Sequence, residues 1–548
     1  MTLQTLFDQA LGFHQHGQLV DAERLYLRVL QAAPDSFEAL HMLGVVRAQQ
    51  NRNAEALELI GAALQLRPRD PLTLTNYGNA LAALERQQEA LASHDAALAG
   101  APDYADAWNN RGNALKGLGR LDDALTSYQK AVALRPDFTG ALSNQGNVLH
   151  QLGRFEDALA SYDRTLAIDP RHVDAYYNRG NLLHDMSRHA DAVASYNQAL
   201  AIWPQHVDAW TNRGLSLQNL KRLDAALESF DRAIAIDGAR AHPRYSKALC
   251  LMLAGRFAEG LPLREWRKKL PEPVEARTYP QPLWTGTEDI AGKTLFAHIE
   301  QGLGDTIQFY RYAAAAQARG AKVVLAVQDG IKHLLQRAAP QVELIGYYEK
   351  PEAFDYHIPL MSLPLALGMD HMPIPVPYLQ AEPERVERWA GQLGKAGYRI
   401  GVCWEGNRSI PGGAGRSFPP EALAGIANIS GVRLIGLQKD ANSEMLRAAK
   451  IETLGDDFDA GTDAFLDSAA VITNLDLVIS IDASMAHLAG AMGRPVWVAL
   501  KYVPEWRWGL DRTDSPWYPT ARLFRQQTDG DWSDVFAEMQ AELVRLVR

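Results

Sequence analysis

The sequence of 548 residues contains only two cysteines, Cys250 and Cys403, and each lies inside an apolar run. Two isolated thiols predict small core residues in a reducing compartment and argue against a disulfide framework or a cysteine-based metal site. No stretch of about 18 uncharged apolar residues occurs, so we expect no membrane span. The N-terminus lacks a basic segment followed by an apolar block, so we expect no signal peptide and a cytoplasmic location.

A strong charge of either sign is also missing. The sequence has 55 lysines and arginines against 65 aspartates and glutamates, a net charge of −10. This balance argues mildly against nucleic acid or an anionic membrane surface as the main partner. The hydrophobic content of 47% is ordinary for globular proteins and allows large cores. At about 150 residues per domain, the length suggests three to four domains.

The first half contains a repeat of 34 residues in which glycine, alanine and proline recur. The glycines are Gly44, Gly78, Gly112, Gly146, Gly180 and Gly214. The alanines, 12 residues after each glycine, are Ala56, Ala90, Ala124, Ala158, Ala192 and Ala226. The prolines are Pro34, Pro68, Pro102, Pro136, Pro170 and Pro204. Small residues allow two helices to pack closely, and a proline ends the second helix before the next repeat begins.

This period and these residues resemble the tetratricopeptide repeat, whose unit is a pair of antiparallel helices, A and B. Extending the frame by one period places Ala10 before the first glycine and Ala248 after the last one. We therefore predict an α-superhelix, a tetratricopeptide-repeat solenoid, over residues 1–262. It should hold about eight repeats, with degenerate outer repeats as caps.

Polar residues recur at two further positions, although packing of the repeat does not require them. Two places before the glycine stand Asn76, Asn110, Asn144, Asn178 and Asn212, and one place after it stand Asn79, Asn113, Asn147 and Asn181. The two positions are three residues apart and share one face of helix A. In the family that face lines the concave surface, and the first column resembles the asparagine ladder of nucleocytoplasmic O-GlcNAc transferases. We predict that the first column binds the backbone of an extended acceptor peptide. Alternatively, the amides only bond neighbouring helices.

After Arg256 the pattern stops, and prolines mark a connector over residues 263–290, with Trp266 and Trp284 anchoring it to neighbouring surfaces. Apolar runs then alternate with helical segments, which predicts parallel α/β layers. We expect strands at residues 294–299, 322–327, 342–345, 399–404, 433–437, 477–481 and 496–499. We expect helices at residues 305–319, 330–339, 420–429, 462–473 and 484–491. Two Rossmann-like domains, 291–385 and 396–548, would meet at a hinge near residues 380–397, with ligands at the carboxyl ends of the strands.

The motifs fall at those strand ends. Gly302, Gly304 and Asp305 follow the first strand and open a helix, where a tight turn and exposed amides suit an anion. Asp482 to His487 form a second strand–turn–helix, with small residues for a diphosphate and Asp482 and His487 for hydroxyls. Between these two turns lie further candidates for donor binding: Asn407, Arg416, Gln438 and Lys439.

Together these segments resemble glycosyltransferase family 9, the ADP-heptose-type heptosyltransferases, over about 250 residues. The strongest part is Ile481-Asp482-Ala483-Ser484-Met485-Ala486-His487-Leu488, followed by Gly493-Arg494-Pro495-Val496. The resemblance implies a GT-B architecture and inversion at the anomeric centre. It implies that Asp305 is the catalytic base, that Asn407 and Arg416 contact the donor phosphates, and that Asp482 binds a sugar hydroxyl. The amides of Ser484 and Met485 would hold the diphosphate.

The sequence departs from this family in one respect, because the first α/β domain spans only about 100 residues. The repeats would replace the missing part of the acceptor region. The second half also lacks a match to the catalytic histidine segment of O-GlcNAc transferases, so no specificity for UDP-GlcNAc is implied. Asp529-Gly530-Asp531 matches a metal-binding aspartate pair superficially, but its polar surroundings predict a turn. We expect no metal and no cofactor, only a nucleotide-sugar co-substrate.

Structural alternatives exist for most candidates. Asp305 would also be explained as a residue that caps its helix. Arg416 and Lys439 would be explained as solvated surface charges, and His487 as a histidine of the core. The aromatic cluster offers either core packing or a platform for a sugar or base; its members are Trp506, Trp508, Trp517 and Tyr518.

The prediction that joins both halves is an inverting, metal-independent glycosyltransferase. It would move a sugar from a nucleotide-sugar to a hydroxyl of a protein held by the repeats, with no nucleic acid involved. Two alternatives are a scaffold with an inactive enzyme-like half, and an enzyme acting on glycan or lipid that uses the repeats for docking.

Overall fold

The computed structural model describes residues 2–271, 277–369, 375–406, 415–439, 441–461 and 465–547. The chain divides into a first compact unit, residues 1–216, and a second compact unit, residues 217–548. In the described part of the chain, no helix is long and apolar enough to cross a membrane.

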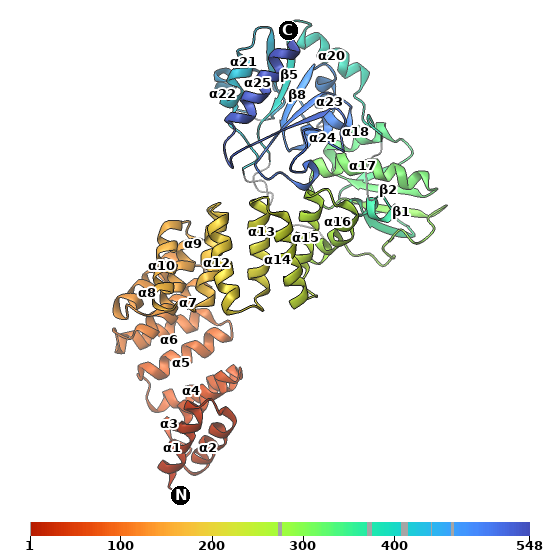
Figure 1. Ribbon diagram of the computed structural model, residues 1–548. Coiled ribbons are helices and arrows are strands. Elements are labelled where there is room, and N and C mark those ends of the chain that lie inside the picture. The colour runs from red at the N-terminus through yellow and green to blue at the C-terminus, as the bar shows by residue number, and fades with distance from the viewer. Residues whose placement is uncertain are drawn as a thin grey trace. The chain divides into compact units, whose positions relative to one another are not determined.

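Sixteen α-helices follow one another along the described residues up to Arg264, as the repeat period predicts (Figure 1). Their bounds are α1 Leu3–Gln15, α2 Leu19–Ala32, α3 Phe37–Gln49, α4 Asn53–Leu66, α5 Pro71–Ala83, α6 Gln87–Gly100, α7 Ala105–Gly117, α8 Leu121–Leu134, α9 Thr139–Gln151, α10 Phe155–Ile168, α11 Val173–Asp185, α12 His189–Ile202, α13 Val207–Asn219, α14 Leu223–Ile236, α15 Ala241–Leu253 and α16 Phe257–Arg264. Odd-numbered helices are helix A of a repeat, and even-numbered ones are helix B.

The periodic glycines are explained by close packing of helix A on helix B. A Cβ atom at Gly112 would lie 2.6 Å from the Tyr128 ring, closer than van der Waals contact allows. The same conflict with a residue sixteen places later would arise at Gly44, Gly78, Gly146 and Gly180. The Tyr128 hydroxyl then donates to Asn113 Oδ1 at 2.8 Å, which satisfies a buried phenol.

The second unit contains two sheets in which all paired strands run parallel. The first sheet has the order β3-β2-β1-β4 and the second has the order β10-β9-β8-β5-β6-β7. The strands are β1 Thr294–His298, β2 Lys322–Val327, β3 Glu343–Gly346, β4 Tyr356–Pro359, β5 Tyr398–Cys403, β6 Val432–Gly436, β7 Ile451–Glu452, β8 Leu477–Ile481, β9 Val496–Leu500 and β10 Ala521–Arg525. All five residues of β8 are buried, as expected for a parallel strand covered on both faces.

Helices cover these sheets and connect their strands. They are α17 Leu303–Ala318, α18 Asp329–Ala338, α19 Leu363–Ala366, α20 Pro383–Leu393, α21 Ala424–Ala427, α22 Ser443–Ala448, α23 Leu466–Thr473, α24 Ser484–Ala491 and α25 Ser533–Val547, with short 3₁₀ turns η1 Glu265–Lys269, η2 Leu360–Ser362, η3 Pro420–Leu423 and η4 Trp506–Trp508. The strand order reverses at β1/β4 and at β5/β8. Such switch points open a crevice at the carboxyl ends of the strands, where ligands of α/β sheets bind.

The segment expected to be a hinge, residues 380–397, contains α20. The buried indole of Trp389 in α20 donates to Asp467 Oδ1 in α23 at 2.9 Å. Arg385 and Arg388 bond the same carboxylate. The residues of the expected hinge thus include an ordered helix that is bonded to α23 of the domain that follows it.

The core of the second unit includes the last repeat. Leu253 and Leu261 belong to the same buried cluster as Trp506, Trp508 and residues of the first sheet. In the connector, the backbone N–H of Trp284 donates to the His357 carbonyl of β4, and its side chain is buried. The repeat pattern thus ends near residue 264, whereas the compact unit begins at Leu217.

Candidate functional site

The two predicted turns, one with Gly302 and Gly304 and the other at Asp482 to His487, lie against each other. Gly302 is the N-cap of α17, which follows β1, and α24 follows β8 after Asp482. A Cβ atom at Gly304 would lie 2.8 Å from His487 Cδ2 and 3.6 Å from Ser484 Cα. Only a residue without a side chain allows this approach. The structure therefore brings Gly302, Gly304, Ser484 and His487 together at the switch points of the two sheets.

Asp305 stands in the first turn of α17, and its carboxylate forms an ion pair with Arg507. The Arg507 side chain is buried and also donates to Gln308 Oε1 in α17. Its Nη1 lies 2.7 Å from Glu505 Oε1, and its backbone N–H donates to Glu505 Oε2 at 3.0 Å. Arg507 is thus held between two carboxylates, that of Asp305 in the first turn of α17 and that of Glu505 in the segment after β9, and it fixes the orientation of Asp305.

Two further carboxyl groups, Asp482 and Glu505, share this environment and are hard to ionise. Burial raises the pKa of Asp482, and the opposing effect of Trp508, Arg507 and Arg416 is smaller. Burial raises the pKa of Glu505 to about 7, aided by the charges of Asp482 and Asp305 and opposed by Arg507. A carboxyl group with a pKa near 7 changes its charge within the neutral pH range.

His487 is a buried imidazole whose two nitrogens face defined neighbours. Its Nδ1 shares a hydrogen bond of 2.9 Å with the Tyr518 hydroxyl, and its Nε2 lies 3.9 Å from Asp482 Oδ1. Burial, with Arg507 and Arg311, holds the pKa of His487 well below 6.5. This neutral, packed histidine fits the core alternative, and its predicted contact with a ligand hydroxyl remains a prediction.

Cationic groups stand beside the Asp482 turn. Arg416 Nη1 donates to the Asp482 carbonyl at 3.4 Å. A Cβ atom at Gly406 would lie 2.7 Å from Arg416 Nε, so the guanidinium packs directly on the glycine backbone. Lys501 follows directly after β9, and burial lowers the pKa of its amine. Asn407, a predicted phosphate contact, lies outside the described residues.

The remaining predicted donor residues have partners within the protein. Gln438 Oε1 accepts from the Glu405 backbone N–H at 3.1 Å and from Cys403 Sγ at 3.4 Å, which ties the ends of β5 and β6 together. Lys439 Nζ donates to the Asp459 carbonyl at 3.2 Å. The Met485 side chain is buried, so its backbone amide is the group that would serve a ligand. These bonds suit structural roles, and binding by these residues stays a prediction.

Sequence patterns did not indicate Lys501, Glu505 and Arg507. They follow β9 in a segment where charged residues alternate with tryptophans, and the aromatic cluster around them is buried, as its core interpretation predicts. A sequence in which charged residues alternate with tryptophans indicates buried ion pairs, because a charged side chain is stable in the core only when it is paired.

The asparagine columns lie on helix A, as predicted, and bond each other across repeats. Asn144 Nδ2 donates to Asn113 Oδ1 at 3.2 Å, and Asn212 Nδ2 donates to Asn181 Oδ1 at 2.9 Å. At the same position, Asn76 bonds His41 and Asn110 accepts from Asn109, while Asn178 is half-buried. The structural alternative is therefore realised for Asn144 and Asn212, and peptide binding remains a prediction.

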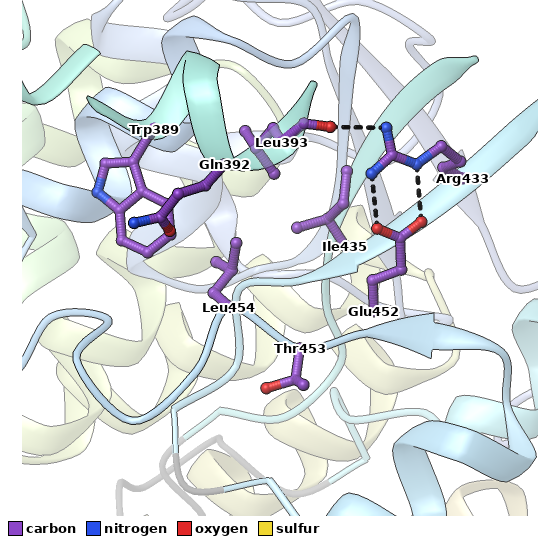
Figure 2. A pocket seen from close by; sticks show the side chains of 8 residues that line it. All are labelled: Trp389, Gln392, Leu393, Arg433, Ile435, Glu452, Thr453 and Leu454. Atoms are coloured by element: carbon purple, nitrogen blue, oxygen red, sulfur yellow. Dashed lines mark hydrogen bonds and ion pairs between the residues drawn. The ribbon is translucent and has the colours of Figure 1, made fainter. Parts of the chain in front are cut away.

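A cavity of about 140 Å³ lies elsewhere in the second unit (Figure 2). Its lining residues are Trp389, Gln392, Leu393, Arg433, Ile435, Glu452, Thr453 and Leu454. Arg433 pairs with both oxygens of Glu452 and donates to the Leu393 carbonyl. Its charge is thus used within the protein, and none of these residues belongs to the two motif turns.

The predicted turn at residues 529–531 is present. Gly530 has a φ of +80°, and Asp531 Oδ1 accepts from the Ser533 backbone N–H at 2.9 Å. Asp531 therefore serves the start of α25. Across the described ranges, no group of three or more His, Cys, Asp or Glu side chains is placed to hold a metal ion.

Comparison with known proteins identifies the repeats. Tetratricopeptide-repeat models match residues 7–71, 105–138, 146–187 and 177–241. Protein FlbA of Caulobacter vibrioides is 29% identical over 332 residues, which cover 55% of this chain and 54% of that protein. The chain thus spans about half the length of this relative. The first half is a tetratricopeptide-repeat solenoid, and such repeats suggest a peptide or protein partner.

Solved structures of repeat proteins are similar to parts of the chain. YrrB, described as a TPR protein with an unusual peptide-binding site, is 23% identical and covers 35% of this chain and 98% of its own, with a TM-score of 0.31. A tetratricopeptide repeat protein from Parabacteroides merdae is 19% identical and covers 45% of this chain and 98% of its own, with a TM-score of 0.38.

Proposed function

We propose that the chain is an inverting glycosyltransferase of GT-B architecture that transfers a sugar from a nucleotide-sugar to a hydroxyl group of a protein acceptor. One observation carries this proposal. The Asp305 turn and the Asp482–His487 turn face each other at the switch points of two parallel sheets, with charged groups of both signs around them. Nucleotide ligands of α/β sheets bind at such switch points.

The donor diphosphate would lie at the N-terminus of α24. The amides of Ser484 and Met485 are not used by the helix itself and attract anions. Arg416, held on Gly406 beside this turn, would neutralise the charge that develops as the diphosphate leaves. Asp482 would accept a hydrogen bond from a sugar hydroxyl.

Asp305 would accept the proton of the acceptor hydroxyl. As that oxygen bonds to the anomeric carbon, the bond from this carbon to the diphosphate breaks, and the nucleoside diphosphate leaves on the opposite face. Arg507 fixes the Asp305 carboxylate in place for this step. The repeats would raise the local concentration of the protein acceptor near the site.

The replacement Asp305→Asn tests the base. We expect it to keep donor binding but to lower sugar transfer by about 10²-fold or more, the usual contribution of a general base. Transfer is measured over a panel of UDP-, GDP-, ADP- and dTDP-linked sugars with a cell extract as the source of acceptor. Binding is measured by thermal shift with the corresponding nucleoside diphosphates, because a ligand of the folded state raises the unfolding temperature.

A catalytically inactive scaffold is the competing function, favoured by the use of Asp305 in the Arg507 ion pair. A wild-type protein that is stabilised by no nucleoside diphosphate and hydrolyses no nucleotide-sugar would support the scaffold. Equal turnover by the wild type and by Asp305→Asn would instead support the glycosyltransferase activity but show that Asp305 is not its base.

Arg416→Ala tests the phosphate site. The arginine approaches the Asp482 turn and is expected to contact two phosphates, so its loss should weaken binding of nucleoside diphosphates by roughly 1.5–3 kcal/mol. Calorimetric titration measures this effect, with the phosphate-free nucleoside as the control. If binding of the diphosphate and binding of the phosphate-free nucleoside are weakened equally, Arg416 supports the fold of the site and does not bind phosphate.

A further inference from the structure

The segment of residues 501–508 carries Lys501, Glu505 and Arg507, and it is contacted at both ends by the last two repeats. At its start, Lys221 Nζ lies 3.6 Å from the centre of the Tyr502 ring. Lys221 is in the turn between α13 and α14. At its end, the Phe257 ring of α16 packs edge to face with the rings of Trp506 and Trp517. The ring centroids are 6.1 Å and 5.9 Å apart, respectively. Helix α16 thus packs directly on the segment.

The two tryptophans connect Phe257 to Arg507. Trp506 is the neighbour of Arg507 in sequence, and the Trp517 indole N–H donates to the Arg507 carbonyl at 2.9 Å. The two indole rings pack edge to face, with their centroids 5.6 Å apart. The guanidinium of Arg264, also in α16, lies 5.5 Å from the Trp506 ring and donates to the Met361 carbonyl at 3.2 Å. The backbone of Arg507 is therefore enclosed by side chains that rest on α16.

We propose that the last two repeats are a structural part of the site, and that Phe257 is the residue that positions Arg507 against Asp305. Lys221 supports the other end of the same segment. This inference rests on the proposed function, in which Asp305 acts on the acceptor. The repeat array is then more than a detachable docking arm, because its final helix sets the geometry of the charged centre.

The repeats themselves provide matched controls. Phe155 opens α10 as Phe257 opens α16, three repeats apart, and its side chain is 38% exposed. Ser187 occupies the turn position of Lys221 one repeat earlier, and both residues have a left-handed backbone, with φ of 59° and 58°. Phe155→Ala repeats the loss of a phenylalanine ring, and Ser187→Gly repeats the backbone change, both in the first compact unit, whereas the segment 501–508 belongs to the second.

The first experiment needs no substrate. Hydrogen exchange is followed in the full-length protein for the backbone amides of residues 505–509, where the Trp508 N–H donates to the Glu505 carbonyl at 3.1 Å. Phe257→Ala should accelerate exchange there about tenfold or more, whereas Phe155→Ala should leave it unchanged. Lys221→Gly, which also relaxes a strained backbone position, should accelerate exchange of residues 501–505 relative to Ser187→Gly. Unchanged exchange in both test variants would overturn the inference.

The second experiment measures kinetics with the nucleotide-sugar that gives turnover in the panel. Phe257→Ala should lower kcat about tenfold or more with little change of KM for the donor, since a displaced catalytic group affects the chemical step. Phe257→Tyr, which keeps the ring, should restore kcat. A higher KM at constant kcat would overturn the positioning role. If no nucleotide-sugar is turned over by the wild type, the proposed function fails, and the exchange experiment alone decides the packing claim.

Discussion

At the scale of single residues, Arg507 organises the charges of the site. Its guanidinium contacts Asp305 and Glu505, and Asp482 lies close enough to influence the pKa of Glu505. Three carboxyl groups in one cluster cannot all ionise without cost, because like charges at short range oppose each other. Glu505 bears much of this cost, since its pKa rises to about 7.

Glu505→Gln tests this assignment through pH. The folded-state pKa of Glu505, about 7, exceeds its ordinary value of 4.5, so the folded protein binds the proton more tightly. The associated stability is fully present below pH 4.5 and is lost as the pH rises through about 7. Because the glutamine does not titrate, the variant should gain stability relative to wild type between pH 5 and 8.

The gain should be on the order of 1 kcal/mol, reduced from the full linkage value because the Glu505 side chain is 33% exposed and solvent screens it. Thermal unfolding at a series of pH values measures the difference between variant and wild type. A difference that does not vary with pH would contradict the raised pKa.

At the scale of elements, the turn between helix A and helix B has the same backbone conformation in all eight repeats. The residue between helix A and helix B has a φ between 58° and 77° in every repeat, the left-handed region that favours glycine. These residues are Gly17, Asn51, Glu85, Gly119, Gly153, Ser187, Lys221 and Gly255. Four of the eight are glycine and Asn51 tolerates this region, so Glu85, Ser187 and Lys221 carry backbone strain.

Glu85→Gly should therefore stabilise the first unit by about 0.5–1 kcal/mol, since the left-handed cost of a side chain exceeds the extra backbone entropy of glycine. Glu85 is exposed, so little packing is lost. Thermal unfolding of the full-length protein gives the comparison, with Glu85→Ala as the matched variant that loses the carboxylate but keeps the Cβ atom. Equal stability of the two variants would show that the turn is not strained.

Elements with a strong local pattern could be predicted from the sequence, and others could not. The apolar runs of β2 and β8 have the predicted bounds, and the repeat helices follow from their period. Strand β10 was missed because Arg522 and Arg525 interrupt its apolar residues, and β4 because it includes a histidine and ends at a proline. The pairing of Asp305 with Arg507 joins residues 202 positions apart, and no local pattern encodes such a contact.

At the scale of the whole molecule, the proposed function raises the question whether the repeats bind the protein acceptor. The first asparagine column is partly used within the array, since Asn144 and Asn212 each donate to the preceding repeat. Asn144 Nδ2 donates to both Asn109 and Asn113, and Asn212 Nδ2 donates to both Tyr177 and Asn181. An amide has only two N–H donors, so the carbonyl oxygen with its two lone pairs is the group that would accept from a peptide N–H. The column is thus able to join repeats and to bind a peptide backbone at the same time.

Replacing Asn144, Asn178 and Asn212 together with alanine separates these roles. Each lost backbone hydrogen bond should cost about 0.5–1.5 kcal/mol, so acceptor affinity should fall by a few kcal/mol while donor hydrolysis stays unchanged. Tyr162→Phe is the control, because it removes a cross-helix bond to Asn147 and leaves the first column intact. Protein glycosylation and donor hydrolysis are compared in the same preparations. Loss of both activities in the triple variant would mean that the amides mainly hold the superhelix together. Loss of neither would mean that the protein acceptor does not use this groove.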